Sequence, residues 1–243
     1  MKKAGMKKGK NKEFSTPYTV TNAVAKGNII TKLSLLIMGL GNIAHKQIGK
    51  GIMFLAVEAA YIWYMIQSGI YNLSMLPSLG WREQEKVWNE KKSIYEYTAG
   101  DQSSLILLYG VATVYITAMF IIVWRESVKS SYKSEVLEKS GKHLNNFKED
   151  CKSLLDQNLY KLLLAAPVMG ILIFTILPLI YNITMAFTNY SKVNDHLVLF
   201  DWVGLANFKK ILNFGDSIGK QFYSVLGWTL IWAIVAVSYT HLT

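Results

Sequence analysis

The sequence has little charge and almost no cysteine. Only 17% of its 243 residues are charged, against about 25% in ordinary soluble domains. Its one cysteine, Cys151, excludes an internal disulfide framework, and the null interpretation of an inert thiol fits it best. Apolar residues make up 51% of the chain. This composition is typical of a membrane protein.

Motifs of catalysis and metal binding are also missing. Four scattered histidines have no partner at metal-ligand spacing, namely His45, His143, His196 and His241. There is no G-x-S-x-G elbow and no phosphate-binding P-loop. We therefore expect no enzyme, no metal site and no cofactor, so any ATP must be bound by another chain. The net charge of +10 could suggest nucleic acid, but the basic residues gather between uncharged runs, so we expect no nucleic-acid partner.

The longest uncharged run is Leu162 to Ser191, thirty residues. As a helix it would be about 45 Å long, more than the roughly 30 Å of a bilayer's hydrocarbon core. Pro167 and Pro178 lie inside it, and each removes a backbone donor. In a membrane such prolines are tolerated when neighbouring helices and local adjustment satisfy the freed backbone groups. The run predicts a kinked, packed span over 162–187.

Three further runs predict spans. They are 51–68, 104–124 within the uncharged stretch from Gln102 to Trp124, and 221–237, which only reaches the lower limit for a span. Glu58 is the only charge inside them. An acid near mid-bilayer costs at least about 2.5 kcal/mol, so Glu58 should face protein or water. It is either a functional site or a structurally hydrogen-bonded acid, and the second alternative is favoured because no span offers a basic partner.

The remaining segments are polar or short. Residues 1–32 form a basic arm, and 33–50 are predicted as an interfacial or half-inserted helix, because the apolar run 33–44 is too short to cross. Segment 125–161 is predicted as a cytoplasmic loop, and its Phe147, Cys151 and Leu154 at helical spacing predict within it an amphipathic helix lying on the membrane or docking a partner. Residues 238–243, SYTHLT, are expected to be an artefactual tail on a truncated reading frame.

Basic residues in alternating loops predict the topology. The arm 1–32 and the segment 125–161 each hold eight Lys and Arg, whereas 69–103 and 192–220 hold four each. Cytoplasmic loops carry the excess of Lys and Arg. We therefore place the amino terminus inside and the loop 69–103 outside, with three complete spans and the beginning of a fourth in a bacterial cell membrane.

Three pieces of the chain resemble a known family. Ala166 to Asn194 (APVMGILIFTILPLIYNITMAFTNYSKVN), Val203 to Leu212 (VGLANFKKIL) and the tripeptide at 228–230 (WTL) are similar, in this order, to the MalF-type permease subunit of bacterial maltose/maltodextrin ATP-binding-cassette importers, of which the chain would be an amino-terminal fragment. The positions that match the family's motifs are Pro167, Pro178, Phe187, Thr188, Asn189, Tyr190, Gly204, Asn207 and Phe208.

The resemblance implies an all-α, multi-spanning importer permease of type I, with 162–237 as the start of its transport core. It implies four kinds of partner besides the lipid bilayer: a second, MalG-like permease subunit, two MalK-like ATPase subunits and an extracytoplasmic sugar-binding protein. The loop after the motif AFTNYS is too short for the large external domain of the best-known member. The family's cytoplasmic coupling loop and sugar-contacting helices would lie beyond residue 243, so the substrate-binding residues stay unknown.

A second hypothesis comes from a different class. The chain could be a membrane assembly or scaffold protein that does not transport, docking a cytoplasmic partner through the amphipathic segment at 143–161. Further spans and a coupling loop downstream would favour the permease.

Overall fold

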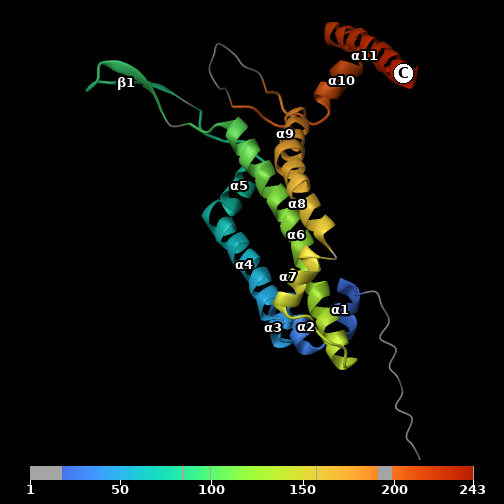
Figure 1. The fold of residues 1–243 in the computed structure, drawn as a ribbon. Coiled ribbons are helices and arrows are strands. Elements are labelled where there is room, and N and C mark those ends of the chain that lie inside the picture. The colour runs from blue at the N-terminus through green and yellow to red at the C-terminus, as the bar shows by residue number, and fades with distance from the viewer. Residues whose placement is uncertain (1–17, 84, 99, 157, 191–198, 243) are drawn as a thin grey trace, which may run out of the picture. The chain divides into compact units, whose positions relative to one another are not determined.

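The computed structural model describes residues 18–242 apart from 84, 99, 157 and 191–198, and it is mostly helical (Figure 1). The helices and strands are α1 (Val20–Lys26), α2 (Ile29–Leu33), α3 (Leu40–Ala44), α4 (Ile48–Tyr64), the π-helical turn η1 (Met65–Gly69), α5 (Ile70–Met75), β1 (Lys86–Asn89), β2 (Ile94–Tyr97), α6 (Ser103–Lys139), α7 (Phe147–Leu155), α8 (Leu159–Ile171), the π-helical turn η2 (Leu172–Ile176), α9 (Leu177–Met185), α10 (Ala206–Leu212) and α11 (Ser217–Leu242).

Among the residues that the structure describes, four helical stretches are long and apolar enough to cross a membrane. They are Ile48–Met75, Ser103–Lys139, Leu159–Met185 and Ser217–Tyr239. Each coincides with one of the four runs that the sequence singles out, so the prediction of a multi-spanning helical membrane protein is confirmed. The third stretch ends two residues before the predicted limit of 187. α11 continues through most of 238–243, and the prediction of an artefactual tail stays a prediction.

α6 corrects the interpretation of 125–139 as loop. The helix continues without a break from the uncharged run to Lys139. Ion pairs one turn apart support this extension, Lys129 with Glu126 at 2.6 Å and Lys139 with Glu135. The amphipathic segment follows separately as α7, whose first turn has a capping box between Asn146 and Glu149.

The two prolines of the third stretch have different positions in it. Pro167 lies inside α8, and Pro178 lies in the first turn of α9, and both are inside one continuous helical stretch from Leu159 to Met185. η2 immediately precedes this turn, and π-helical turns are among the usual causes of a kink. None of the residues in the most apolar window of Leu159–Met185 is buried. Among the described residues, the packing of this stretch is limited to a few contacts: Ile180, Tyr181 and Met185 pack against the buried core of unit 2, and the Tyr115 hydroxyl donates to the Leu172 carbonyl at 3.1 Å.

The chain divides into two compact units, and unit 1 comprises 1–67 and 116–168. In it the short helices α1 to α3 gather beside the carboxyl-terminal end of α6 (Figure 1). Its buried apolar core consists of Ala23, Val128, Tyr132 and Val136, with Tyr18, Val20, Leu35 and Trp124 packed against it. The amino-terminal segment is thus anchored on an extended helix of the same unit.

A polar seam joins these segments beside the apolar core. Ser127, Ser131 and Ser134 recur at helical spacing on α6. The Ser127 hydroxyl accepts from the Gly39 N–H at 3.1 Å, and Ser131 contacts Ser34 at 2.9 Å. These bonds satisfy polar groups that are buried between the segments.

The structure differs from the sequence prediction at 33–50, where one helix is expected. α2 ends at Leu33, a turn follows, and α3 and α4 begin at Leu40 and Ile48. Gly39 has a left-handed φ of 79°, which breaks the helix at little cost only because the residue is glycine. The membrane position of this segment stays a prediction.

Unit 2 comprises 68–115 and 169–243. Leu79, Leu107, Val111 and Phe200 form its buried core, and side chains of α9 such as Tyr181 pack against it. β1 and β2 form an antiparallel hairpin in which Trp88 lies opposite Tyr95. The sequence analysis did not predict this hairpin, because its strands are only four residues long and lie in a mixed-charge loop.

Candidate functional site

The family motifs meet in one folded corner of unit 2, which we call the motif corner and define as residues 186–190 and 200–208. The chain leaves α9 after Met185, and the two segments pair with each other. The Val203 N–H donates to the Phe187 carbonyl at 2.8 Å, and the Asn189 N–H donates to the Asp201 carbonyl at 3.0 Å. An isolated antiparallel bridge joins Thr188 and Trp202 between these bonds.

Asn207, in the first turn of α10, connects the two segments of the motif corner by hydrogen bonds. Its side-chain amide donates to the Ala186 carbonyl at 3.0 Å and to the Thr188 carbonyl at 2.8 Å. A carboxamide carries two N–H donors on one nitrogen, so it can bridge two carbonyls at the end of a helix. Ala186 is the C-cap of α9, where the helical ladder leaves acceptors without partners, and Thr188 lies two residues further, in the bridge with Trp202. Asn207 therefore acts as a cap for a helix about twenty residues away.

Aromatic pairs pack on both sides of these hydrogen bonds. Phe187 and Phe208 have ring centroids 5.1 Å apart, and Tyr190 and Phe200 form an edge-to-face pair at 5.4 Å. Such pairs contribute about 0.5–1.5 kcal/mol beyond the area they bury. One partner of each pair comes from either side of the corner, so the rings hold its two segments together.

Gly204 makes the sharp entry into α10 possible. Its φ is 58°, in the left-handed region, where a residue with a Cβ is strained by about 1–2 kcal/mol. No atom outside its immediate neighbours lies within 4 Å of where a Cβ would stand. The backbone angle, and not lack of space, is therefore the reason for glycine at this motif position.

The corner is fixed to the rest of unit 2. The Trp202 indole N–H donates to the Leu76 carbonyl at 3.0 Å, and the Phe200 N–H donates to the Ser103 hydroxyl at 3.2 Å. Seven of the nine motif positions thus lie together, whereas Pro167 and Pro178 lie on the helices α8 and α9. The corner has no acid–base pair or nucleophile in contact, so its chemistry is that of a rigid connection between two apolar helices.

Glu58 has a backbone partner in unit 1. Its carboxylate accepts from the Met38 N–H at 2.8 Å, in the turn between α2 and α3. This is the kind of contact that the structural alternative for Glu58 requires. It gives the acid a role in holding the broken amino-terminal segment against α4.

Glu135 is a buried acid that the sequence analysis missed. Its side chain is only 2% exposed, and it accepts from the Asn28 N–H at 2.9 and 3.0 Å, from the Thr31 hydroxyl and from Lys139. Asn28 is the N-cap of α2, so the carboxylate serves the positive end of that helix. The only sequence signal was its position four residues before Lys139, which is common on solvated helices.

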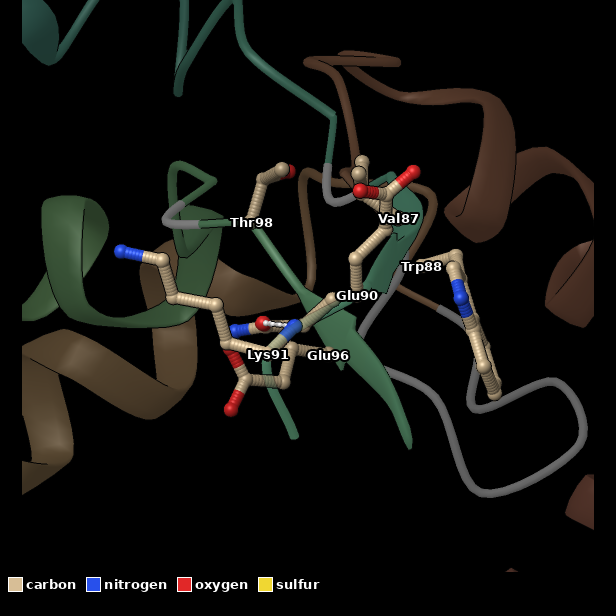
Figure 2. Close-up of a pocket in the computed structure, with 7 residues that line it drawn as sticks. Val87, Trp88, Glu90, Lys91, Glu96 and Thr98 are labelled. Carbon is tan, nitrogen blue, oxygen red and sulfur yellow. Dashed lines mark hydrogen bonds between the residues drawn. The ribbon is translucent and has the colours of Figure 1, made fainter. Parts of the chain in front are cut away.

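The β1–β2 hairpin has an open hollow of about 520 Å³, lined by Val87, Trp88, Asn89, Glu90, Lys91, Glu96 and Thr98 (Figure 2). Figure 2 shows Trp88 directed away from the polar group around Glu96. On the other face of the hairpin Trp88 forms an edge-to-face pair with Tyr95 at 4.9 Å. Hydrogen bonds from Lys92 and then Asn89 hold the pKa of Glu96 below its usual range. The hollow is a solvated polar surface whose Glu96 carboxylate is already paired with Lys92.

Comparison with known proteins finds several permease proteins that are similar to the chain. The Bacillus subtilis (strain 168) maltodextrin transport system permease protein MdxF is 28% identical over 225 residues, which are 91% of this chain and 47% of that protein. The maltodextrin transport system permease protein MalC of Streptococcus pneumoniae (serotype 4, strain ATCC BAA-334 / TIGR4) is 29% identical over 83% of this chain and 43% of its own. The galactooligosaccharides transport system permease protein GanP of B. subtilis (strain 168) is 26% identical over 85% and 46%.

The chain is similar to the permease proteins of maltodextrin and galactooligosaccharide transport systems. It spans less than half of the length of these relatives. No protein-family model matches it, and no solved structure matches it significantly. Permeases are transport proteins and not enzymes, in agreement with the expectation from the sequence.

Proposed function

We propose that the chain is part of a permease subunit of an ATP-driven carbohydrate importer in a bacterial cell membrane. The observation that carries this proposal is the similarity to three oligosaccharide permeases over 205 to 225 residues, which includes nearly the whole chain. The four apolar helices supply the spans that such a subunit needs.

We assign the substrate to the class of short oligosaccharides, with maltodextrins as the first candidate. Two of the relatives named above carry maltodextrin in their names, and the third carries galactooligosaccharides. A neutral sugar is recognised by hydrogen bonds and ring stacking, and its contacts need not include a charge. The residues that contact the sugar are left unassigned.

The partners of the proposed subunit follow from its mechanism. A second, MalG-like permease subunit would complete the path, two MalK-like ATPase subunits would bind the ATP, and an extracytoplasmic binding protein would deliver the sugar. The chain itself then needs no cofactor. The orientation with the amino terminus inside rests on the eight basic residues in each of 1–32 and 125–161.

Uptake in the native host tests the proposal. Deletion of the gene should reduce uptake of radiolabelled maltotriose at least tenfold and leave glucose uptake unchanged, and a plasmid copy should restore it. Loss of galacto-oligosaccharide uptake in place of maltotriose uptake would correct the substrate. Unchanged uptake of both, in membranes shown to lack the protein, would refute the permease function.

Thiol labelling tests the orientation in the same strain. With Cys151→Ser as background, a membrane-impermeant reagent added to intact cells should label a cysteine at position 78 and not one at position 140. The opposite pattern would overturn the assignment without affecting the uptake result.

A further inference from the structure

Unit 1 contains a small cavity beside the extended part of α6. Its volume is about 170 Å³, and its lining comes from the turn before α4, from α6, from the turn after α6 and from α7. The lining residues are Gln47, Lys50, Ser130, Lys133, Ser134, Leu137, His143, Asn145 and Asp150. At about 30 Å³ per water, the cavity has room for several waters, and hence for one phosphate group with part of its carrier.

The floor of the cavity is buried and held in place by hydrogen bonds. Gln47 and Ser134 are 7% and 2% exposed. The Ser134 hydroxyl donates to the Gln47 side-chain carbonyl at 2.8 Å, and the Gln47 amide donates to the Asn145 carbonyl at 3.2 Å. The Ser130 oxygen accepts from the Asn42 amide at 2.9 Å. Because a hydroxyl has one donor of its own, Ser130 can still donate toward the cavity.

The rim carries an excess of positive charge. Lys50 pairs with Asp150 at 2.9 Å, and Asp150 also accepts from the Asn145 amide. Lys133 lies 6.0 Å from the Tyr18 ring, and it forms no ion pair with any residue that the structure describes. The lining contains two lysines and one aspartate, and the ring of its His143 contacts the Glu149 carboxylate at 2.9 Å. The Asp150 carboxylate is already paired with Lys50, so the cavity offers no unpaired carboxylate to a cation.

We propose that this cavity binds the phosphate group of a phosphate ester, with Lys133 and Ser130 as its first donors and Lys50 shared between the ligand and Asp150. Phosphate presents several acceptor oxygens to donors that converge from different sides, and ammonium groups bind it as point charges. The proposal does not depend on sugar import, because it rests on unit 1 alone.

Two sources could present this chemistry. Ser130 lies six residues beyond Trp124, which is about 9 Å along the helix axis. The headgroup layer on each side of the hydrocarbon core is about 5–8 Å thick. With the predicted span ending at Trp124, the cavity would lie near the outer limit of that layer, within reach of an anionic lipid headgroup and of a soluble phosphate ester.

Thermal unfolding of the purified protein separates these sources. In detergent, at constant ionic strength, inorganic phosphate and glycerol 3-phosphate should raise the unfolding midpoint saturably. Lys133→Gln should weaken their half-saturation at least fivefold, and Lys133→Arg should restore most of it. Lys129→Gln is the matched control, since Lys129 lies one turn earlier on the same helix, pairs with Glu126 and is absent from the lining.

A second arm uses nanodiscs of phosphatidylcholine with and without phosphatidylglycerol. Stabilisation by phosphatidylglycerol alone, lost in Lys133→Gln and kept in Lys129→Gln, would identify the lipid as the source. A response to the soluble esters would identify a metabolite. No response in either arm, or an equal loss in both variants, would overturn the proposal, because surface charge alone would then explain the data.

Discussion

Replacing Asn207 should destabilise the motif corner. The prediction concerns above all the relative size of the loss in two variants, Asn207→Ala and Asn207→Asp. Asn207→Ala removes two hydrogen bonds from a half-buried amide. At about 0.5–1.5 kcal/mol each, the loss is about 1–2 kcal/mol once partial exposure is considered. Asn207→Asp should be worse, near 3 kcal/mol, because an ionised carboxylate faces the carbonyls of Ala186 and Thr188 without a donor.

Hydrogen exchange measures this locally. One to two kcal/mol corresponds to a factor of about 5–30 in an opening equilibrium. The amides of Asn189 and Val203, whose bonds join the two segments, should exchange faster by this factor in Asn207→Ala and faster still in Asn207→Asp. Asn213→Asp is the control, because the Asn213 side chain accepts from the Gly215 N–H through its oxygen, which aspartate keeps. Equal exchange in all three variants, or a larger effect for Ala than for Asp, would refute the capping role.

Three further predictions concern acidic side chains of unit 1. Glu135→Ala should lower the free energy of unfolding by about 2–4 kcal/mol, because it leaves the Asn28 N–H and the buried Thr31 hydroxyl without their acceptor, and Glu135→Gln should cost less. Glu58→Gln should change the unfolding midpoint little, since an amide oxygen can still accept from Met38, whereas Glu58→Leu should lower it. The bonds from the Asn146 backbone N–H and then from the His143 ring hold the pKa of Glu149 below its usual range. A lowered pKa means that this carboxylate stabilises α7 fully above its ordinary pKa and loses that effect as the pH falls through the lowered one. A ¹³C carboxyl titration should therefore show a midpoint below 4.5 that rises in His143→Ala, which removes one of the two hydrogen-bond partners.

The spans could be predicted because they depend on a property of consecutive residues. The run from Leu162 to Ser191 contains no charge over a length typical of a membrane span. This property does not depend on which other segments pack against the run. The extension of α6 to Lys139 was not predictable in the same way. Its charges and serines are equally compatible with a loop, and the helix is stabilised by contacts with residues about a hundred positions earlier.

In the motif corner, the resemblance to a family predicted important residues that hydrophobic periodicity could not. Periodicity alone could not place Asn207 against the end of α9, because the pairing joins positions about twenty residues apart through irregular backbone. The family motif singled out Gly204 and Asn207 without a physical reason, and the structure supplies one for each in the left-handed φ and the bridging amide. The hairpin had neither a period nor a motif, so it was missed.

Three polar side chains described above have the same structural role. Asn207, Glu135 and Glu58 each bond backbone groups at a helix end or turn that is distant in sequence. Backbone groups without helical partners are costly near a membrane, because no water is available to satisfy them in the apolar layer. A chain with interrupted helices must therefore supply side chains at each break. This requirement accounts for an acid such as Glu58 in an apolar run through its bond to the Met38 N–H, and it predicts that the amide isostere should serve nearly as well.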